Sequence, residues 1–415
     1  MGNANQRIAR AKAAASSIGL ANTQVKNAVL RNIAALLPLR TDEILAGNAL
    51  DMQRAAAEGM TPGLQDRLRL DEARIDALAK AVLEVVELPD PIGDVIRGRT
   101  LPNGLKLEQV RVPFGVVGAI YEARPNVTID IAALAIKSGN AVVLRGGTAA
   151  EHSNRALVKV LQDALEACGV NPDAVQSVDE FGRPGAQAMM QAVGQIDVLI
   201  PRGGHSLIQT VLSESKVPVI ETGEGVVHIF IDETARADWA VDIIVNSKIQ
   251  KIGACNAVET LLVHSKAYER VMPSVVAALQ DKAVTLHGDE RTQAAFSGII
   301  PATEADWAVE YLAMDLAIRT VDSLDEALTH IAKYSTKHTE SIITEDYSNS
   351  ERFINEVDAA VVMVNASTRF TDGGEFGFGA EVGISTQKMH SRGPMGLPEL
   401  TSTKWIVRGT GHIRA

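Results

Sequence analysis

Cysteine is scarce in this chain, which has Cys168 and Cys255 and no other in its 415 residues. Two cysteines cannot build a disulfide framework, and such sparse use indicates a reducing compartment, so we expect a cytoplasmic protein. Neither Cys-x-x-Cys nor His-Glu-x-x-His occurs, so the sequence predicts no metal site. Long apolar runs are missing too. No stretch reaches about 18 apolar residues, so we expect no membrane-spanning segment.

Basic residues are outnumbered by acidic ones, 40 to 51, which gives a net charge of −11. Nucleic-acid binding depends on an excess of Lys and Arg, so this balance argues against a nucleic-acid partner. A small anionic substrate stays compatible, because a local basic pocket can form on an acidic protein. No acid precedes Asp42, a feature shared with transit peptides. The apolar spacing nevertheless continues through 29–39, and we favour surface helices of the mature fold.

Two patterns of apolar residues divide the chain. Over 5–87, Ala and Leu recur at three- and four-residue spacing, which predicts a series of helices. Alternating flanks around Asn103-Gly104 predict a hairpin over about 95–113, either an oligomer contact or a plain sheet edge. From 115 onward, short apolar runs alternate with helical stretches, which indicates two blocks of parallel α/β structure. The expected strands are 114–122, 141–145, 174–178, 196–201 and 217–221 in the first block, then 257–264, 341–345 and 359–365 in the second, with a last strand at 401–409.

The carboxyl ends of the first-block strands are candidates for ligand binding, because parallel α/β sheets bind ligands at that edge. Neither GxGxxG nor a Walker A sequence is present. Arginine forks match phosphate geometry, so Arg145 and Arg202 could hold phosphate, although a surface salt bridge is the alternative for each. The residues at these ends are Arg145, Gly146, Gly147, Arg202, Gly203, Gly204, Glu221, Thr222 and Gly223.

Cys255 lies in the segment QKIGACNAVE, a loop expected between a helix and a strand. A thiolate presented by a loop is a strong nucleophile whose reactivity follows its local environment. A small buried apolar residue is the alternative. Cys168 ends an amphipathic helix just before Gly169, which is a packing position. From the residues alone, both interpretations of Cys255 stay open.

The motifs FGVVGAI, GNAVVLRGG, PVIETGEG, KIGACNAVE and AAVVMVNAST, in this order and spacing, resemble the aldehyde dehydrogenase superfamily. YEARPNVT, RGGTAAEHSN, QKIGACNA and FTDGGEFGFGAEVGIST resemble its acyl-phosphate-reducing branch in particular. The resemblance covers nearly the whole chain. It implies an α/β fold of two parallel-sheet domains plus a small oligomerisation hairpin, and a homo-oligomer. The implied domains are a cofactor-binding domain over 1–225, a catalytic domain over 226–368, and a return segment and oligomerisation tail over 369–415.

The resemblance also implies a reaction. L-glutamyl 5-phosphate would be reduced by NADPH to L-glutamate 5-semialdehyde and phosphate, through a Cys255 thioester, in L-proline biosynthesis. A kinase that makes the acyl phosphate would be a possible partner. Asn126 approximately matches the oxyanion asparagine of the superfamily, with a helix N-cap as its alternative role. Arg124 would bind a substrate anion, with a scaffold salt bridge as the alternative.

Cofactor residues follow from the same resemblance. Arg145 takes the place of a lysine near the adenosine ribose, and no acid suited to a ribose 2′-OH follows, which favours NADPH over NADH. Glu310 matches a contact to the nicotinamide ribose, although Leu312 replaces the usual phenylalanine. Glu221 aligns with a general base that activates water. Reduction of an acyl phosphate needs no such water, so we expect Glu221 at the nicotinamide side or in loop ordering.

Two rival functions remain open at this point. One is a hydrolytic aldehyde dehydrogenase that makes a carboxylic acid, which would oxidise its aldehyde equally well without phosphate. The other is a non-catalytic relative that serves as a binding or scaffold protein, in which Cys255→Ala would change nothing. The presence of Glu221, Gly253 and Cys255 argues against the second.

Overall fold

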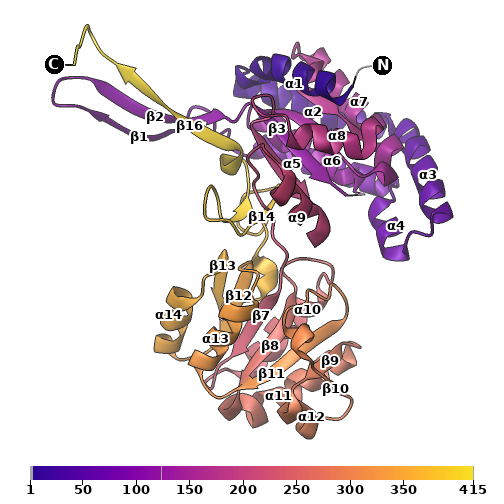
Figure 1. Cartoon of the computed structure of the whole chain (residues 1–415), viewed down its shortest axis with the longest axis vertical. Helices are drawn as coiled ribbons and strands as arrows, with labels where there is room; N and C mark the ends of the chain where they lie inside the picture. The colour runs from indigo at the N-terminus through magenta and orange to yellow at the C-terminus, as the bar shows by residue number, and fades with distance from the viewer. Residues whose placement is uncertain (1–2, 123, 415) are drawn as a thin grey trace. The chain divides into compact units, whose positions relative to one another are not determined.

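The structure, a computed structural model, describes residues 3–122 and 124–414. The chain forms two compact units, coloured along the chain in Figure 1. The first contains Met1–Thr222, Gly377–Gly383 and Met395–Ala415, and the second contains Gly223–Phe376 and Ile384–Pro394. Each unit is built on its own parallel sheet, so the predicted α/β class is confirmed.

The first unit begins with helices, as the 5–87 spacing predicts. Asn3, Asn22 and Asp71 cap three of them by accepting a backbone N–H in the first turn. Their buried faces carry Ala, Ile, Leu and Val at helical spacing, which packs them into the core of this unit. The helices are α1 (Ala4–Gly19), α2 (Thr23–Leu39), α3 (Thr41–Ala57), α4 (Pro62–Leu68) and α5 (Glu72–Glu87).

A four-stranded parallel sheet forms the centre of the first unit, in the order β5-β4-β3-β6. One of its two inner strands, β3, is buried along its whole length, as a strand covered on both faces must be. The strands are β3 (Val116–Tyr121), β4 (Ala141–Arg145), β5 (Val175–Ser177) and β6 (Val198–Arg202), and the helices after them are α6 (Pro125–Lys137), α7 (Glu151–Ala167), α8 (Gly182–Met190) and α9 (His205–Glu214).

The strand expected at 217–221 is wrong. This segment has only a single β-bridge, between Leu199 and Val219, and no strand is assigned to it. Its two backbone hydrogen bonds to Leu199 attach it to the edge of β6, after which the chain leaves the sheet. Glu221 and Thr222 therefore lie in irregular chain at the end of this segment of the first unit.

The predicted hairpin forms and gains a third strand from the C-terminus, as Figure 1 shows. β1 (Val95–Thr100) pairs antiparallel with β2 (Lys106–Pro113), and β16 (Thr401–Arg408) pairs with the other edge of β2. Gly104 adopts a positive φ in the turn, which favours glycine there. All of β1 is exposed in the single chain.

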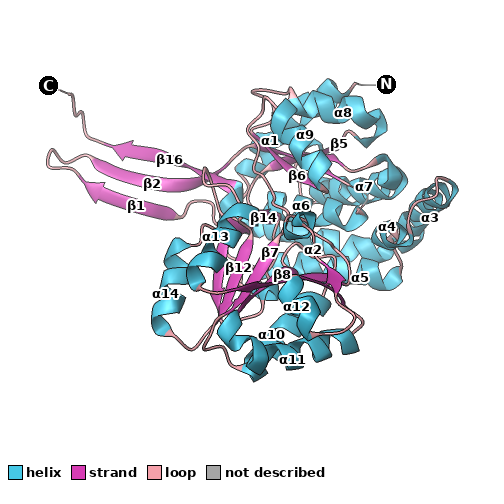
Figure 2. Cartoon of the chain, turned by 60° about the horizontal axis from the view of Figure 1, so that its bottom comes forward, coloured by secondary structure: helices cyan, strands magenta, loops and turns pink. Residues whose placement is uncertain are grey.

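The second unit contains a seven-stranded parallel sheet in the order β10-β9-β11-β8-β7-β12-β13. Successive residues of β7 serve opposite faces: Ile229 and Ile231 join the core under α10 and α11, whereas Phe230 joins the core under α13 and α14. Helices cover both faces of this sheet (Figure 2). The strands are β7 (Val227–Ile231), β8 (Val258–His264), β9 (Thr285–Gly288), β10 (Ile300–Pro301), β11 (Asp315–Val321), β12 (Thr339–Ile343) and β13 (Val361–Val364), with helices α10 (Ala237–Ile249), α11 (Ser265–Asp281), α12 (Glu290–Ala295), α13 (Leu324–Tyr334) and α14 (Tyr347–Glu356).

Two short strands, β14 (Gly383–Ser385) and β15 (Gly393–Met395), pair with each other at the third and fourth positions where the chain changes from one unit to the other. The sequence analysis did not anticipate them, nor β7, β9, β10 and β11. No helix in the described part of the chain is both long and apolar enough to cross a lipid bilayer.

Candidate active site

Cys255 lies in a turn between the end of α10 and the start of β8, as predicted, and its side chain is half-buried. The neighbouring Asn256 fixes this turn. Its side-chain amide donates to the Thr371 carbonyl oxygen at 2.8 Å, and its own carbonyl accepts from the Thr368 hydroxyl at 2.6 Å. The loop that carries the thiol is therefore held from a second segment of the same unit.

Gly225 supports the same turn from the other side. A Cβ on Gly225 would overlap the Cys255 carbonyl oxygen and lie 3.2 Å from its Cα, so only glycine fits. The Glu310 carboxylate accepts the Gly225 N–H at 2.9 Å and holds this segment in place. Burial raises the pKa of Glu310, and the Gly225 N–H opposes that rise. The structure thus brings together two predicted residues, Cys255 and Glu310, through a glycine that the sequence analysis did not single out.

A buried ion pair joins the two elements that flank the Cys255 turn. Lys248 Nζ on α10 lies 2.6 Å from Glu259 Oε2 on β8, and both side chains are fully buried. Burial raises the pKa of Glu259 to about 7, while Lys248 opposes the rise. The other Glu259 oxygen accepts the Leu312 N–H at 3.3 Å. The sequence analysis missed this pair, although both residues interrupt otherwise apolar faces.

Gly223, the third predicted residue in this unit, lies against β14 and the residue that follows it. Its N–H donates to the Ile384 carbonyl oxygen at 2.9 Å, and a Cβ there would lie 2.6 Å from the Thr386 methyl carbon. The segment around Gly223 and Gly225 therefore contacts the Cys255 turn at one end and the 384–394 segment at the other.

The remaining predicted residues belong to the first unit. Arg145 ends β4 and is partly buried, and its Nε has no hydrogen-bond partner among the described residues. Burial lowers the pKa of Arg145, and Asp179 opposes that change. Asp179 also accepts the Gly146 N–H at 2.6 Å and the Asn154 amide at 2.8 Å. Burial raises the pKa of Asp179 to about 7.

The glycines at these strand ends allow neighbouring side chains to pack closely against the backbone. A Cβ on Gly146 would overlap the Asn154 side-chain nitrogen. A Cβ on Gly203 would lie 2.8 Å from the Glu122 carboxylate, which also accepts the Gly204 N–H at 3.0 Å. Gly147 precedes a short 3-10 turn in extended backbone. The Gly146 and Gly204 N–H groups already have protein partners, a role that the sequence pattern did not reveal.

Asn126 occupies the first turn of α6, and the alternative that it caps the helix is wrong. The N-cap position belongs to Arg124, which is exposed, and Asn126 lies two residues inside. The Asn126 amide instead donates to Asp130 Oδ2 at 3.1 Å. Burial raises the pKa of Asp130 to about 6, and Asn126 and Arg202 oppose the rise. Asn126 is thus oriented by a partly buried acid one helical turn away.

Glu221 is partly buried in the irregular segment before Gly223, and burial raises its pKa. Its neighbour Thr222 donates its hydroxyl to the Pro201 carbonyl oxygen at 2.7 Å. Arg202 lies at the end of β6, and its own carbonyl oxygen accepts the Glu122 N–H at 3.1 Å. These contacts hold the end of the first unit against β6.

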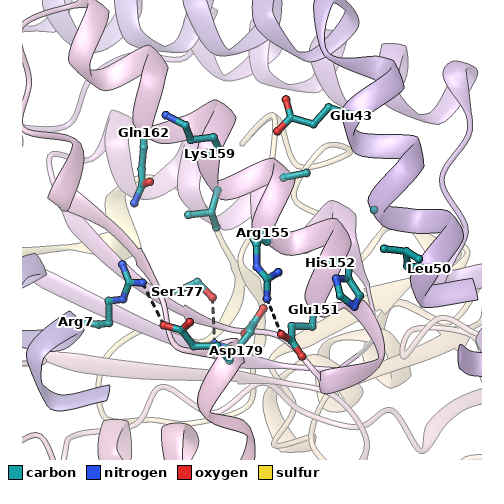
Figure 3. Close-up of a pocket in the computed structure, with 14 residues that line it drawn as sticks. Arg7, Glu43, Leu50, Glu151, His152, Arg155, Lys159, Gln162, Ser177 and Asp179 are labelled. Carbon is teal, nitrogen blue, oxygen red and sulfur yellow. Dashed lines mark hydrogen bonds and ion pairs between the residues drawn. The ribbon is translucent and has the colours of Figure 1, made fainter. Parts of the chain in front are cut away.

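A pocket of about 560 Å³ lies in the first unit, beside α7 and near the end of β5 (Figure 3). That volume is in the range of small-molecule sites. Arg155 pairs with Glu151 at 2.8 Å and Arg7 pairs with Glu180 at 3.1 Å, so these pocket cations are already compensated. Asp179 connects the pocket to the end of β4 through its bond to Gly146. Arg145, with its unpartnered Nε, remains the better candidate for an anion.

No group of three or more His, Cys, Asp and Glu side chains within 3–122 and 124–414 has an arrangement that could hold a metal ion. The predicted site residues therefore fall into two separate groups, a thiol turn in the second unit and strand ends with an asparagine and two arginines in the first.

Comparison with known proteins gives the class of this site. The model of the aldehyde dehydrogenase family matches residues 2–315, and the chain belongs to that family of oxidoreductases. A gamma-glutamyl phosphate reductase from Leifsonia xyli is 60% identical over 99% of this chain and 97% of its own length, and one from Clavibacter michiganensis is 59% identical over 99% and 95%. The crystal structure of a gamma-glutamyl phosphate reductase from Thermotoga maritima matches all of both chains at 45% identity with a TM-score of 0.97. Within the aldehyde dehydrogenases, the chain is a member of the gamma-glutamyl phosphate reductase family.

Proposed function

We propose that this protein reduces L-glutamyl 5-phosphate to L-glutamate 5-semialdehyde and phosphate with NADPH, in L-proline biosynthesis. The observation that carries the proposal is the built turn of Cys255, fixed by Asn256 on one side and by Gly225 on the other. The glycine contact fixes the main chain of Cys255 and, with it, the position from which the thiol is presented. The membership of the chain in the gamma-glutamyl phosphate reductases supplies the substrate.

The chemistry starts at Cys255 Sγ. The thiolate attacks the acyl carbon, the bond from that carbon to the phosphate oxygen breaks, and a thioester on Cys255 remains. This covalent route divides one difficult displacement into two easier steps. The tetrahedral species formed during attack carries an oxyanion, which needs hydrogen-bond donors. Removal of one such donor costs about 3–4 kcal/mol in other enzymes.

Two groups are proposed as the oxyanion donors, the backbone N–H of Cys255 and the side-chain amide of Asn126. An asparagine amide has two N–H donors. One of them is directed at Asp130, which leaves the second for the substrate. Asp130 is then the group that fixes the orientation of Asn126.

The residues at the strand ends of the first unit fit a phosphorylated dinucleotide. Arg145 keeps a buried Nε without a protein partner, which is a vacant donor for an anionic oxygen in a part of the sheet suited to nucleotides. We assign Arg145 to the 2′-phosphate and Arg202, Gly203, Gly204 and Gly147 to the rest of the cofactor site. NADPH, when bound, supplies the hydride that converts the thioester to the aldehyde level. Gly146 and Gly204 serve the site indirectly, because their N–H groups are used by Asp179 and Glu122.

The two glutamates and Gly223 are assigned positioning roles near the nicotinamide. Glu310 orders the Gly225 segment beside the thiol. Burial raises the pKa of Glu221, but reduction of an acyl phosphate consumes no water, so a general base at Glu221 would only drain the thioester by hydrolysis. Arg124 is assigned to a substrate anion. A homo-oligomer assembled through β1, β2 and β16, in the cytoplasm, completes the proposal.

The reverse reaction tests the proposal against the hydrolytic alternative. The purified protein is incubated with L-glutamate 5-semialdehyde and NADP+, with and without inorganic phosphate, and NADPH formation is followed. The proposal requires that phosphate be needed for turnover, because phosphate must cleave the thioester. Equal rates without phosphate would identify a hydrolytic aldehyde dehydrogenase, and no turnover in either case would reject the proposed substrate.

A further inference from the structure

Arg392, in the loop between β14 and β15, is a partly buried cation whose hydrogen-bonding capacity is mostly unused. Its Nη1 donates to Asp358 Oδ1 at 2.8 Å. Its Nε and Nη2 are buried and have no partner among the described residues, and the hydroxyl of the adjacent Ser391 is in the same state. Buried guanidinium N–H groups without partners are costly, and they are typical of places where a ligand completes the bonding.

Two lysines surround the same aspartate. Lys388 Nζ lies 2.8 Å and Lys337 Nζ lies 3.3 Å from Asp358 Oδ2. Together with Arg392 they place three positive charges around one carboxylate, and within the described chain none of the three makes another ion pair. This cationic cluster therefore keeps an excess of positive charge on a protein whose net charge is −11.

The cluster lies at the same edge of the second sheet as the nucleophile. Cys255 precedes β8, Lys337 precedes β12 and Asp358 precedes β13, and the strands β8, β7, β12 and β13 are parallel neighbours. Their amino ends therefore meet at one edge. Three strand spacings of about 4.8 Å separate β8 from β13, or roughly 14 Å in all.

The 384–394 segment bridges that interval. At its beginning, the Ile384 carbonyl accepts the Gly223 N–H, two residues from the glycine that touches Cys255. At its end, Gly393 lies beside the start of β13, where a Cβ would be 3.9 Å from the Ala360 carbonyl oxygen. Arg392 and Ser391 are thus attached to the edge that carries the thiol, within one unit.

We infer that Arg392, with Ser391 and Lys388, binds the α-carboxylate of the glutamyl substrate while its acyl carbon is at Cys255. The inference rests on the proposed function. The α-carboxylate lies four bonds from the acyl carbon, a shorter distance than the interval between β8 and β13. The cation that holds it must therefore be offset from the thiol along the same edge and extend back toward it, as the long side chain of Arg392 can. A guanidinium with two free N–H groups on one side matches the two oxygens of a carboxylate. The cluster thereby selects aldehydes and acyl phosphates that carry an amino-acid head group.

Steady-state kinetics of Arg392→Gln in the oxidation of L-glutamate 5-semialdehyde tests this assignment. The KM for the semialdehyde should rise roughly tenfold to a hundredfold, as for loss of a charged hydrogen bond, with kcat changed less than about threefold. The KM for phosphate and the kcat/KM for butanal, which has no α-carboxylate, should stay within about twofold. Arg392→Lys keeps the positive charge but loses the forked guanidinium. Its KM for the semialdehyde should lie between those of the wild type and Arg392→Gln.

Arg352→Gln is the matched control, because Arg352 also pairs with carboxylates on an exposed face of this unit. It should leave every constant unchanged. If Arg392→Gln does not fold, Arg392→Lys and Ser391→Ala test the assignment instead. Each should raise the KM for the semialdehyde by about threefold or more.

An unchanged semialdehyde KM in all of these variants would overturn the inference, and a rise in the phosphate KM alone would assign the cluster to phosphate and overturn it as well. Either result leaves the proposed function standing, since the wild-type protein is still active. Absence of wild-type turnover would instead reject the proposed function and, with it, the inference that depends on it.

Discussion

Gly225 and Cys255 are in main-chain contact, so close that a Cβ on Gly225 would fall 2.5 Å from the Cys255 carbonyl carbon. The requirement for glycine is one of space, because Gly225 is not among the glycines in the left-handed region of φ. The segments that precede β7 and β8 are thus in direct contact at the residue that carries the thiol. The geometry of the nucleophile is a property of the neighbouring strand as much as of its own loop.

Gly225→Ala should therefore displace the Cys255 turn. We expect kcat/KM to fall by roughly a hundredfold or more, because small displacements of reacting groups have effects of that size. The free energy of unfolding should fall by about 1–3 kcal/mol through overpacking. Steady-state kinetics and denaturant unfolding measure the two effects. Gly63→Ala is the control, since a Cβ there meets no atom within 4 Å, and it should leave kcat/KM unchanged and not lower the free energy of unfolding.

The buried pair of Lys248 and Glu259 should behave as a unit. Lys248→Met leaves a buried carboxylate without its partner and should lower the free energy of unfolding by about 3–5 kcal/mol. The double variant Lys248→Met/Glu259→Leu should recover most of that loss, because both charges are removed together. Urea denaturation of the single and double variants gives the coupling energy. Additive effects of the two substitutions would show that the pair is not energetically coupled.

His338 should make stability depend on pH. Burial lowers its pKa to about 4, and its Nε2 has no partner among the described residues. In the unfolded chain this histidine has an ordinary pKa of about 6.5, so it takes up a proton before the folded protein does. The contribution of neutral His338 to the free energy of unfolding is therefore complete above about pH 6.5 and is lost as the pH falls toward 4. The contribution amounts to about 3 kcal/mol across that window.

The variant His338→Asn isolates this contribution. Its free energy of unfolding should vary less between pH 6.5 and 4 than that of the wild type. Substitution of the exposed His412 by Asn should leave the wild-type slope unchanged. Parallel pH profiles for wild type and His338→Asn would contradict the assignment.

Arg145→Glu should weaken binding of NADPH much more than binding of NADH, because only NADPH carries the 2′-phosphate. We expect the KM for NADPH to rise at least about tenfold more than that for NADH. Arg155→Glu is an informative comparison, because Arg155 lines the pocket of Figure 3 but already pairs with Glu151. Equal changes for both cofactors in Arg145→Glu would remove Arg145 from this role.

Much of the fold could be predicted because periodicity reports burial. The helices before residue 88, the hairpin at Asn103-Gly104 and most strands follow directly from apolar spacing. The prediction was wrong at 217–221, because an apolar run becomes a strand only where a neighbour offers a continuous set of backbone partners, and Val219 finds only one bridge.

The residues of the candidate site could be named from the sequence, but the contacts between them could not. Motifs and the family resemblance indicated Cys255 and Glu310, but the contact of Gly225 with Cys255 joins residues that are distant in sequence. Likewise, nothing local to Asn126 shows that a residue at the second helical position serves Asp130 instead of capping the helix. Such roles depend on tertiary neighbours, which no single segment encodes.

The most direct test of the account is a covalent one. The protein is quenched in acid during reaction with L-glutamyl 5-phosphate in the absence of NADPH, digested with trypsin and analysed by mass spectrometry. The account predicts a glutamyl adduct on the peptide 252–266, which contains Cys255, and none on the peptide that contains Cys168. Addition of NADPH before the quench should remove the adduct. If the wild-type protein turns over substrate but no adduct is found on 252–266, the account is contradicted. Undiminished activity of Cys255→Ser would contradict it as well.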